Sequence, residues 1–193
     1  MSRPLTNIAA YSDIRASIKT GDIVFFDAAA GFISWVIGVA TGRPPTHGAI
    51  VMRTYGDRVV LMESTLMLAG KRGVQRTYLS ERVPAYDGRI WIAHLSPDIR
   101  RQIDPAKLEA WLLDQEGKRY DMVGAIYAGL DQIFKWLPES TYSRAFFCTR
   151  LCMAGLRNAG LSVEHEYSPT PWQLSQTRLF WKFSQIKGTY QQL

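Results

Sequence analysis

Three short segments of the chain carry side chains that could act together as a nucleophile, its base and an orienting group. His47 begins one apolar segment, and Glu63 follows the next one. Cys148 begins a segment with helical spacing. A thiol of ordinary pKa is only about a few per cent ionised at neutral pH, so a nucleophilic cysteine needs a nearby base such as an imidazole. The order and types of these residues predict a cysteine-nucleophile hydrolase or acyltransferase.

The chain around His47 and Glu63 has the pattern of a β-hairpin. Residues 49–52 and 59–62 are apolar, and a turn-forming sequence at residues 54–57 separates them. Antiparallel pairing brings the residues before the first strand next to those after the second. The hairpin therefore predicts that His47 and Glu63 lie close together, and an imidazole is a partner that a buried carboxylate would need.

Cys148 is expected at the N-terminus of a helix over residues 147–158, where unpaired backbone N–H groups and the helix dipole stabilise a thiolate. By residue type alone, a buried cysteine acting as a small hydrophobe is the more common case, and this alternative suits Cys152 much better. His47 could equally be a packed structural histidine. A zinc site of His47, both cysteines and a carboxylate is disfavoured because a second Cys/His pair is missing. No metal or organic cofactor is expected.

The other histidines and two competing carboxylates have simpler explanations. His94 falls on a strand-like run, and His165 lies between two glutamates and is expected at the surface. Asp22 and Asp121 lie in turn-like sequence, where capping explains an aspartate.

Composition indicates one globular domain over residues 1–193. The chain is 47% hydrophobic and 21% charged, which excludes disordered and fibrous classes. Its net charge of +6 favours an anionic partner such as a cell-wall polymer or a lipid headgroup, although scattered basic residues also fit a role in solubility alone. Nucleic-acid binding is disfavoured because no helix-turn-helix, zinc-finger or RNP-like pattern is present.

The sequence predicts no transmembrane segment. Residues 1–8 have no continuous apolar region typical of a secretory signal, and the apolar residues 32–40 are too few to cross a bilayer. Both cysteines fall on one expected helix, where their directions do not suit a mutual disulfide. Reduced thiols and a cytoplasmic location are expected. Peripheral membrane contact, export by another route and the oligomeric state are left open.

Apolar periodicity and turn residues place the remaining elements. Further strands are expected at residues 23–26, 73–79 and 90–95, helices at residues 31–42, 104–117 and 121–137, and a short turn at residues 171–174. A β-rich first half followed by helices predicts an α+β fold.

These segments resemble the YiiX/YebB-like branch of the NlpC/P60 superfamily, whose members have histidine before cysteine in the chain. The matching segments are residues 21–25, 46–51, 62–64, 120–121, 147–151 and 170–174, and the similarity extends over residues 21–183. The resemblance implies a circularly permuted papain-like fold, with an antiparallel sheet packed against helices. It implies Cys148 as nucleophile, His47 as general base and acid, and Glu63 as the group that orients His47.

Three further residues are candidates for substrate binding. Tyr120 belongs to the tyrosine segment of the resemblance. Arg150 departs from the family pattern, in which glutamate is common, and puts the substrate preference in doubt but not the thiol chemistry. Trp35 lies in the apolar residues 32–37, which could line a lipid-binding groove but more often form core.

The expected activity is cleavage of an amide bond in a cell-wall-type peptide through a thioester intermediate. The alternatives are a lipid acyl hydrolase or acyltransferase on the same triad, and a non-catalytic binding module that retains the fold.

Overall fold

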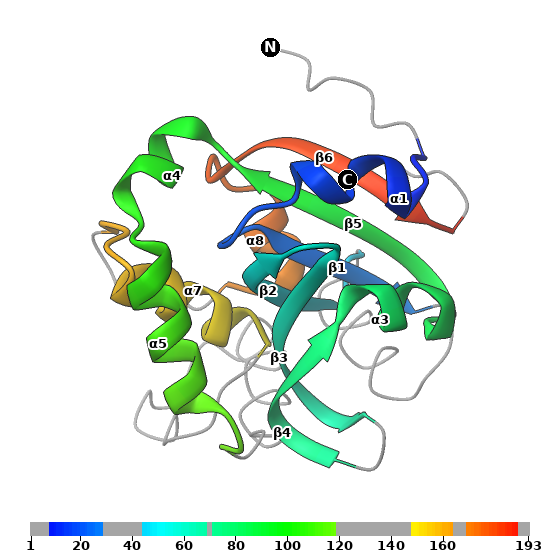
Figure 1. The fold of residues 1–193 in the computed structure, drawn as a ribbon, viewed down its shortest axis with the longest axis horizontal. Coiled ribbons are helices and arrows are strands. Elements are labelled where there is room, and N and C mark those ends of the chain that lie inside the picture. The colour runs from blue at the N-terminus through cyan, green and yellow to red at the C-terminus, as the bar shows by residue number, and fades with distance from the viewer. Residues whose placement is uncertain (1–7, 29–43, 69–70, 119–147, 164–168, 189–193) are drawn as a thin grey trace, which may run out of the picture.

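The computed structural model describes residues 8–28, 44–68, 71–118, 148–163 and 169–188. Its centre is one antiparallel sheet of six strands in the order β4-β3-β2-β1-β5-β6 (Figure 1). The strands are β1 (Ile23–Ala28), β2 (His47–Tyr55), β3 (Arg58–Leu68), β4 (Lys71–Tyr78), β5 (Gly88–Leu95) and β6 (Phe180–Lys187). The helices expected at residues 31–42 and 121–137 lie outside the described residues.

Helices cover both faces of this sheet. They are α1 (Tyr11–Ile14), the 3-10 helix η1 (Arg15–Ser17), α3 (Leu79–Ala85), α4 (Pro97–Gln102), α5 (Pro105–Gln115), α7 (Cys148–Asn158) and α8 (Pro171–Ser175). Helices α5, α7 and α8 contribute to the core on one face, and α1 and α3 pack against the core on the other. The α+β class predicted from the sequence is confirmed.

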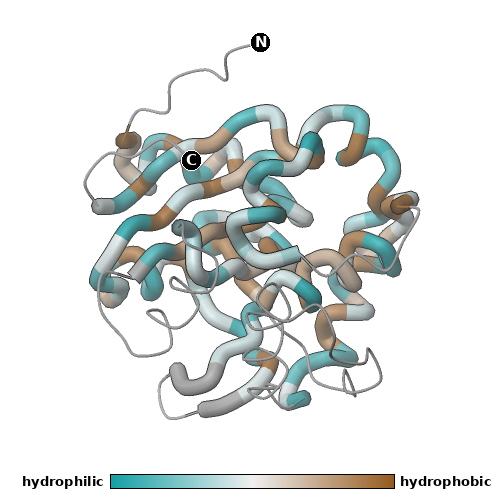
Figure 2. Tube along the Cα trace, turned by 180° about the vertical axis from the view of Figure 1, so that it is seen from behind, coloured by the Kyte–Doolittle hydropathy of each residue, from teal (hydrophilic) through white to brown (hydrophobic). Residues whose placement is uncertain are grey.

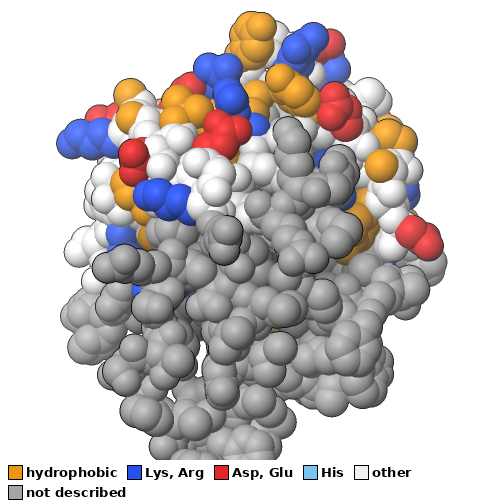
Figure 3. All heavy atoms as spheres, turned by 90° about the horizontal axis from the view of Figure 1, so that it is seen from below, with side chains coloured by type: hydrophobic (Ala, Val, Ile, Leu, Met, Phe, Trp, Pro, Cys, Tyr) orange, Lys and Arg blue, Asp and Glu red, His pale blue; other side chains and the backbone are white. Residues whose placement is uncertain are grey.

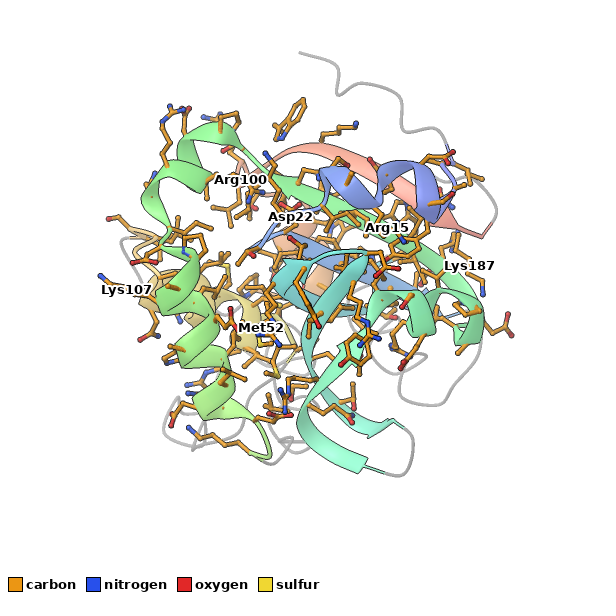
Figure 4. All side chains as sticks on the ribbon, in the orientation of Figure 1. Arg15, Asp22, Met52, Arg100, Lys107 and Lys187 are labelled. Carbon is orange, nitrogen blue, oxygen red and sulfur yellow. The ribbon has the colours of Figure 1, made fainter. Side chains whose placement is uncertain are left out.

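The two cores follow from the alternation of side chains along the strands. In β1, Ile23 and Phe25 belong to the core beneath α5 and α7, whereas Val24 and Phe26 belong to the core beneath α3. Met52 of β2 lies on the α5 side (Figure 4). Seen from behind, the tube alternates between hydrophobic and hydrophilic stretches along its length (Figure 2). Because both faces are covered, β1 is a continuous apolar run instead of an alternating one.

The predicted hairpin is confirmed as β2 and β3, with Tyr55 opposite Arg58 beside the turn. Both strands are longer than expected. His47 is the first residue of β2 and does not precede it, and Glu63 lies within β3, not after its end. The hairpin prediction stopped at the apolar run, although the backbone pairing continues through polar residues.

Strand β6 was not predicted. It pairs with β5 at the edge of the sheet, and its exposed Trp181 and Lys182 break the alternation that would have indicated a strand. The short turn expected at residues 171–174 is α8, which begins with a capping box made by Thr170 and Gln173. The strand expected at residues 73–79 is β4, which starts earlier, and Leu79 already belongs to α3.

The predicted start of helix α5 and the predicted end of α7 have the expected capping, whereas α5 ends at Gln115, two residues earlier than expected. Asp104 accepts hydrogen bonds from the first turn of α5, and Pro105 occupies the first helical position. Helix α7 closes in a Schellman arrangement, because the Gly160 N–H donates to the Arg157 carbonyl and the Leu161 N–H to the Leu156 carbonyl.

Gly160→Ala is expected to destabilise the protein by about 2–3 kcal/mol. Gly160 has a φ of +117°, and a Cβ there would lie 2.5 Å from the backbone oxygen of Gln102. Gly117→Ala is the matched control, because Gly117 also has a positive φ, +82°, but no atom within 4 Å of its Cβ position. This control should cost only about 1 kcal/mol. Urea unfolding of both variants measures the difference, and equal losses would contradict the steric argument.

A buried ionic cluster around Asp22 joins the start of β1 to β5, β6 and α4. Asp22 is fully buried and accepts from the Lys19 and Leu95 N–H groups at 2.9 and 3.0 Å. It forms an ion pair with Arg100 (Figure 4), and its Oδ2 lies 3.2 Å from Nδ1 of His94. The expectation that capping alone explains Asp22 was therefore incomplete.

Asp22→Asn is expected to lower the free energy of unfolding by about 2 kcal/mol, because an amide keeps one acceptor but loses the charge that Arg100 pairs with. Arg100 is 26% exposed, so water limits the cost. Chemical denaturation measures the loss. The control is Asp98→Asn, which removes an exposed ion pair with Arg101 and should leave the free energy of unfolding almost unchanged.

Two further observations bear on the expected partners. Among the described residues, no helix is both long enough and apolar enough to cross a membrane. On the described part of the face in Figure 3, basic and acidic side chains are interspersed, so the surplus positive charge does not gather into one patch there.

Candidate active site

His47 lies at the point where β2 begins, opposite Phe26 of β1. Its imidazole is 5.6 Å from the Phe26 ring, and its side chain is 20% exposed. Nε2 lies 3.0 Å from Oε2 of Glu63. The proximity of these two side chains, predicted from the hairpin, is therefore present in the structure.

Glu63 is fully buried, and its two oxygens have partners from three elements. Oε2 faces His47 and also accepts from Nη2 of Arg82 at 3.3 Å. Oε1 accepts from Thr77 Oγ1 at 2.6 Å and lies 3.1 Å from Nε of Arg82. A carboxylate without solvent is stable here because two cationic groups and a hydroxyl surround it.

Arg82 and Thr77 were missed by the sequence analysis. Thr77 follows from the pairing of β3 with β4, where Glu63 is opposite Gln75 and Leu61 is opposite Thr77. Arg82 comes from α3, whose position depends on tertiary packing. The alternation of side chains along β4 could have indicated that Thr77 lies on the same face as Glu63. No local signal in the sequence indicates that Arg82 contacts Glu63.

Cys148 is the first described residue of α7 and is 6% exposed. Its thiol is hydrogen-bonded to His47, and the backbone N–H groups of Gly48 and Thr149 donate to its sulfur. Because Nε2 of His47 faces Glu63, Nδ1 is the nitrogen left for the thiol. The three predicted site residues thus form one hydrogen-bonded series from Cys148 through His47 to Glu63.

Gly48 lies at the contact between β2 and the start of α7. A Cβ at Gly48 would lie 3.6 Å from Cγ2 of Thr149 and 3.7 Å from the Phe25 ring. The Thr149 hydroxyl in turn donates to the Pro169 carbonyl. Both Cβ distances are ordinary van der Waals contacts, so an alanine would fit at this position, and the backbone N–H of residue 48 would still reach the Cys148 sulfur.

The pKa values of the three groups shift together. Burial would lower the pKa of His47, but its hydrogen bonds to Cys148 and Glu63 outweigh this and raise the pKa to about 9. Burial would raise the pKa of Cys148, yet the hydrogen bond and positive charge of His47 hold it below its ordinary value. Burial opposes ionisation of Glu63 as well, and His47 and Arg82 lower its pKa. These shifts all favour the form in which Cys148 is a thiolate, His47 an imidazolium and Glu63 a carboxylate.

Cys152 has the opposite environment. It is fully buried in the core beneath α5 and α7. Burial, together with the nearby charge of Cys148, raises the pKa of the Cys152 thiol well above its ordinary value. The two cysteines of one helix therefore differ in chemistry, and Cys152 has the environment of a small hydrophobe.

The other predicted site residues are placed only in part. Arg150 is half-buried on α7, two residues after Cys148. Tyr120 and Trp35 lie outside the described residues, as do Asp121 and His165. Within the described ranges, no three or more His, Cys, Asp or Glu side chains are grouped so that they could hold a metal ion.

No family model matches the chain, and no curated protein is significantly similar to it.

Proposed function

We propose that this protein is a cysteine-nucleophile hydrolase that cleaves an amide bond, with a cell-wall-type peptide as the expected substrate, through a thioester intermediate. The observation that carries the proposal is the hydrogen-bonded series from the Cys148 thiol through His47 to the buried Glu63. Such a nucleophile, base and orienting group is the minimum that thiol-based acyl transfer needs.

In the first half of the reaction, the Cys148 thiolate attacks the carbonyl carbon, a C–S bond forms and the carbonyl electrons move to oxygen. The backbone N–H of Cys148, at the start of α7, is the proposed donor to that oxyanion. When the C–N bond breaks, the His47 imidazolium gives its proton to the leaving nitrogen.

In the second half, neutral His47 takes a proton from water as the water oxygen attacks the thioester carbon. The C–S bond then breaks, the carboxylic acid leaves and the thiolate–imidazolium pair is restored. Glu63 keeps the imidazole ring in place throughout, because it accepts from Nε2 and leaves Nδ1 for the reacting sulfur.

A circularly permuted papain-like fold is the proposed origin of this arrangement. Support comes from three features: the histidine precedes the cysteine in sequence, it begins a strand of an antiparallel sheet, and the cysteine begins a helix packed on that sheet. Family membership in the NlpC/P60 superfamily stays part of the proposal.

The test is the alkylation rate of each cysteine against pH, followed by peptide mapping. We expect Cys148 to react with an apparent pKa below about 8.5, whereas Cys152 stays unreactive until the protein unfolds. A Cys152→Ala variant should leave the profile unchanged. The proposal fails if Cys148 is inert or titrates like a free thiol.

Substrate class is tested by trapping the acyl-enzyme. Peptide amides related to bacterial cell-wall stems and short acyl esters are incubated with the protein, and the mass added to Cys148 is measured. Transfer of the peptide acyl group supports the proposed class. Labelling by acyl esters alone would overturn the peptide assignment.

A further inference from the structure

We propose that Arg82 is a positioning residue: by sharing the Glu63 carboxylate with His47, it limits how strongly that carboxylate holds the imidazole proton. The role of Arg82 in catalysis rests on the function proposed above. Its effect on His47 can be measured whether or not the protein is an enzyme.

The geometry shows a carboxylate divided between two cations. Oε2 of Glu63 lies 3.0 Å from Nε2 of His47 and also accepts from Nη2 of Arg82 at 3.3 Å. Nε of Arg82 lies 3.1 Å from Oε1, but its N–H makes no hydrogen bond within the described part of the chain. The contact through Nε is therefore purely electrostatic. One oxygen thus serves both the base and the guanidinium.

Arg82 is held firmly in this position. Its guanidinium lies over the rings of Phe26, 4.9 Å from the centroid, and Tyr86, 5.4 Å from the centroid. The two rings contact each other in an edge-on arrangement at 5.0 Å. The side chain is only 12% exposed, so the cation is largely removed from water and its charge acts strongly on its neighbours.

The charges around Glu63 explain why a second cation is needed there. The titratable or charged groups near Glu63 or its partner Arg82 come from four elements. They are His47 on β2, Cys148 and Cys152 on α7, Arg82 on α3 with Tyr86 just after it, and Asp27 on β1. Burial keeps Tyr86 neutral by raising its pKa, and Asp27 is paired with Arg89.

A thiolate, an imidazolium and one carboxylate alone would leave a buried net negative charge. Arg82 brings the cluster of Cys148, His47, Glu63 and Arg82 to neutrality. Burying a net charge is expensive, so without Arg82 the three remaining groups would all hold protons more strongly. A base that holds its proton too strongly is a poorer acid toward the leaving group, which gives Arg82 its role.

The test is an NMR titration of the His47 ring in the full-length protein, which has only three histidines. Arg82→Gln removes the charge but keeps N–H donors for Glu63, so it is the variant chosen to stay folded. We expect it to raise the His47 pKa, about 9 in the native protein, by about one unit. Arg82→Lys restores the charge and should return the His47 pKa to its native value. The ring resonances of His94, which is hydrogen-bonded to Asp22 and Ser184, serve as the control that the variant stays folded.

A merely structural role for Arg82 would change the titration in the opposite direction. If loss of Arg82 only loosened the site, His47 would lose its hydrogen bonds to Cys148 and Glu63, and its pKa would fall toward 6.5. A fall, or an unchanged titration in Arg82→Gln, overturns the proposal. Glu63→Gln is expected to lower the His47 pKa, so the two variants should shift it with opposite signs.

Alkylation with anionic iodoacetate gives a second readout. The alkylation rate falls at high pH, where the imidazolium beside the thiolate loses its charge. This fall in the pH–rate profile should move to higher pH in Arg82→Gln and return to its native position in Arg82→Lys. If Cys148 is inert in the native protein, the proposed hydrolase is overturned. The Arg82 effect is then decided by the His47 titration alone.

Discussion

His47→Ala is expected to lower the alkylation rate of Cys148 at neutral pH by about 30-fold or more. In the native protein the hydrogen bond and positive charge of His47 lower the pKa of the Cys148 thiol despite burial. Without His47, a thiol of ordinary pKa near 8.5 is only about 3% ionised at pH 7, and the remaining burial penalty reduces this further. Hydrolysis should fall by a larger factor, about 10²–10⁴, because the proton donor to the leaving group is lost as well.

A second variant separates the loss of Cys148 reactivity from a loss of protein stability. His47→Gln, which keeps a polar group near Glu63, should lose the same reactivity with less destabilisation. The pH profile in both variants should move to higher pH, while Cys152 stays protected by the core until unfolding. A Cys148 rate that is unchanged in both variants would show that His47 does not ionise the thiol.

Glu63→Ala is expected to cost about 3–5 kcal/mol in the free energy of unfolding. It leaves the Arg82 guanidinium, 12% exposed, without its anion and the Thr77 hydroxyl without its acceptor. Combining it with Arg82→Met removes both charges, and the double variant should be less destabilised than the sum of the single changes. Additive losses in a double-mutant cycle, measured by chemical denaturation, would contradict the coupling.

The pH dependence of stability offers a second check on Glu63. Its folded pKa lies below the ordinary value of 4.5. The stabilisation is therefore fully present above that value and is lost as the pH falls through the folded pKa. Glu63→Gln should flatten the acid side of the stability profile. A wild-type profile with no loss in acid would contradict the ion pairs.

The sequence could predict contacts that a single hairpin creates. His47 and Glu63 lie on neighbouring strands joined by a short turn, so local pairing was enough to bring them together. Helix α5 was predictable for a similar reason, because Asp104 and Pro105 mark its start within the sequence itself.

Contacts that depend on tertiary packing could not be predicted in this way. Arg82 reaches Glu63 because α3 packs across β3 and β4, and nothing in the residues around it indicates that destination. Strand β6 is an edge strand with exposed Trp181, so it lacks the alternation of a half-buried strand. The pairing of Cys148 with His47 followed only from residue types and from a family resemblance.

The ionised pair at the start of α7 has a consequence for the proton balance of folding. Between pH 6.5 and about pH 9, folded His47 holds a proton that the unfolded side chain would release. The stabilisation that this proton gives the folded protein disappears as the pH rises through about 9. Folded Cys148 gives up its proton at a lower pH than the unfolded thiol does, and its stabilisation disappears as the pH falls through its lowered pKa. The two differences have opposite signs, because inside the protein the pair favours the proton on nitrogen over the proton on sulfur. Folding therefore exchanges fewer protons with solvent through this pair than either group alone would, so the pair makes the stability of the protein less sensitive to pH than a single shifted group would.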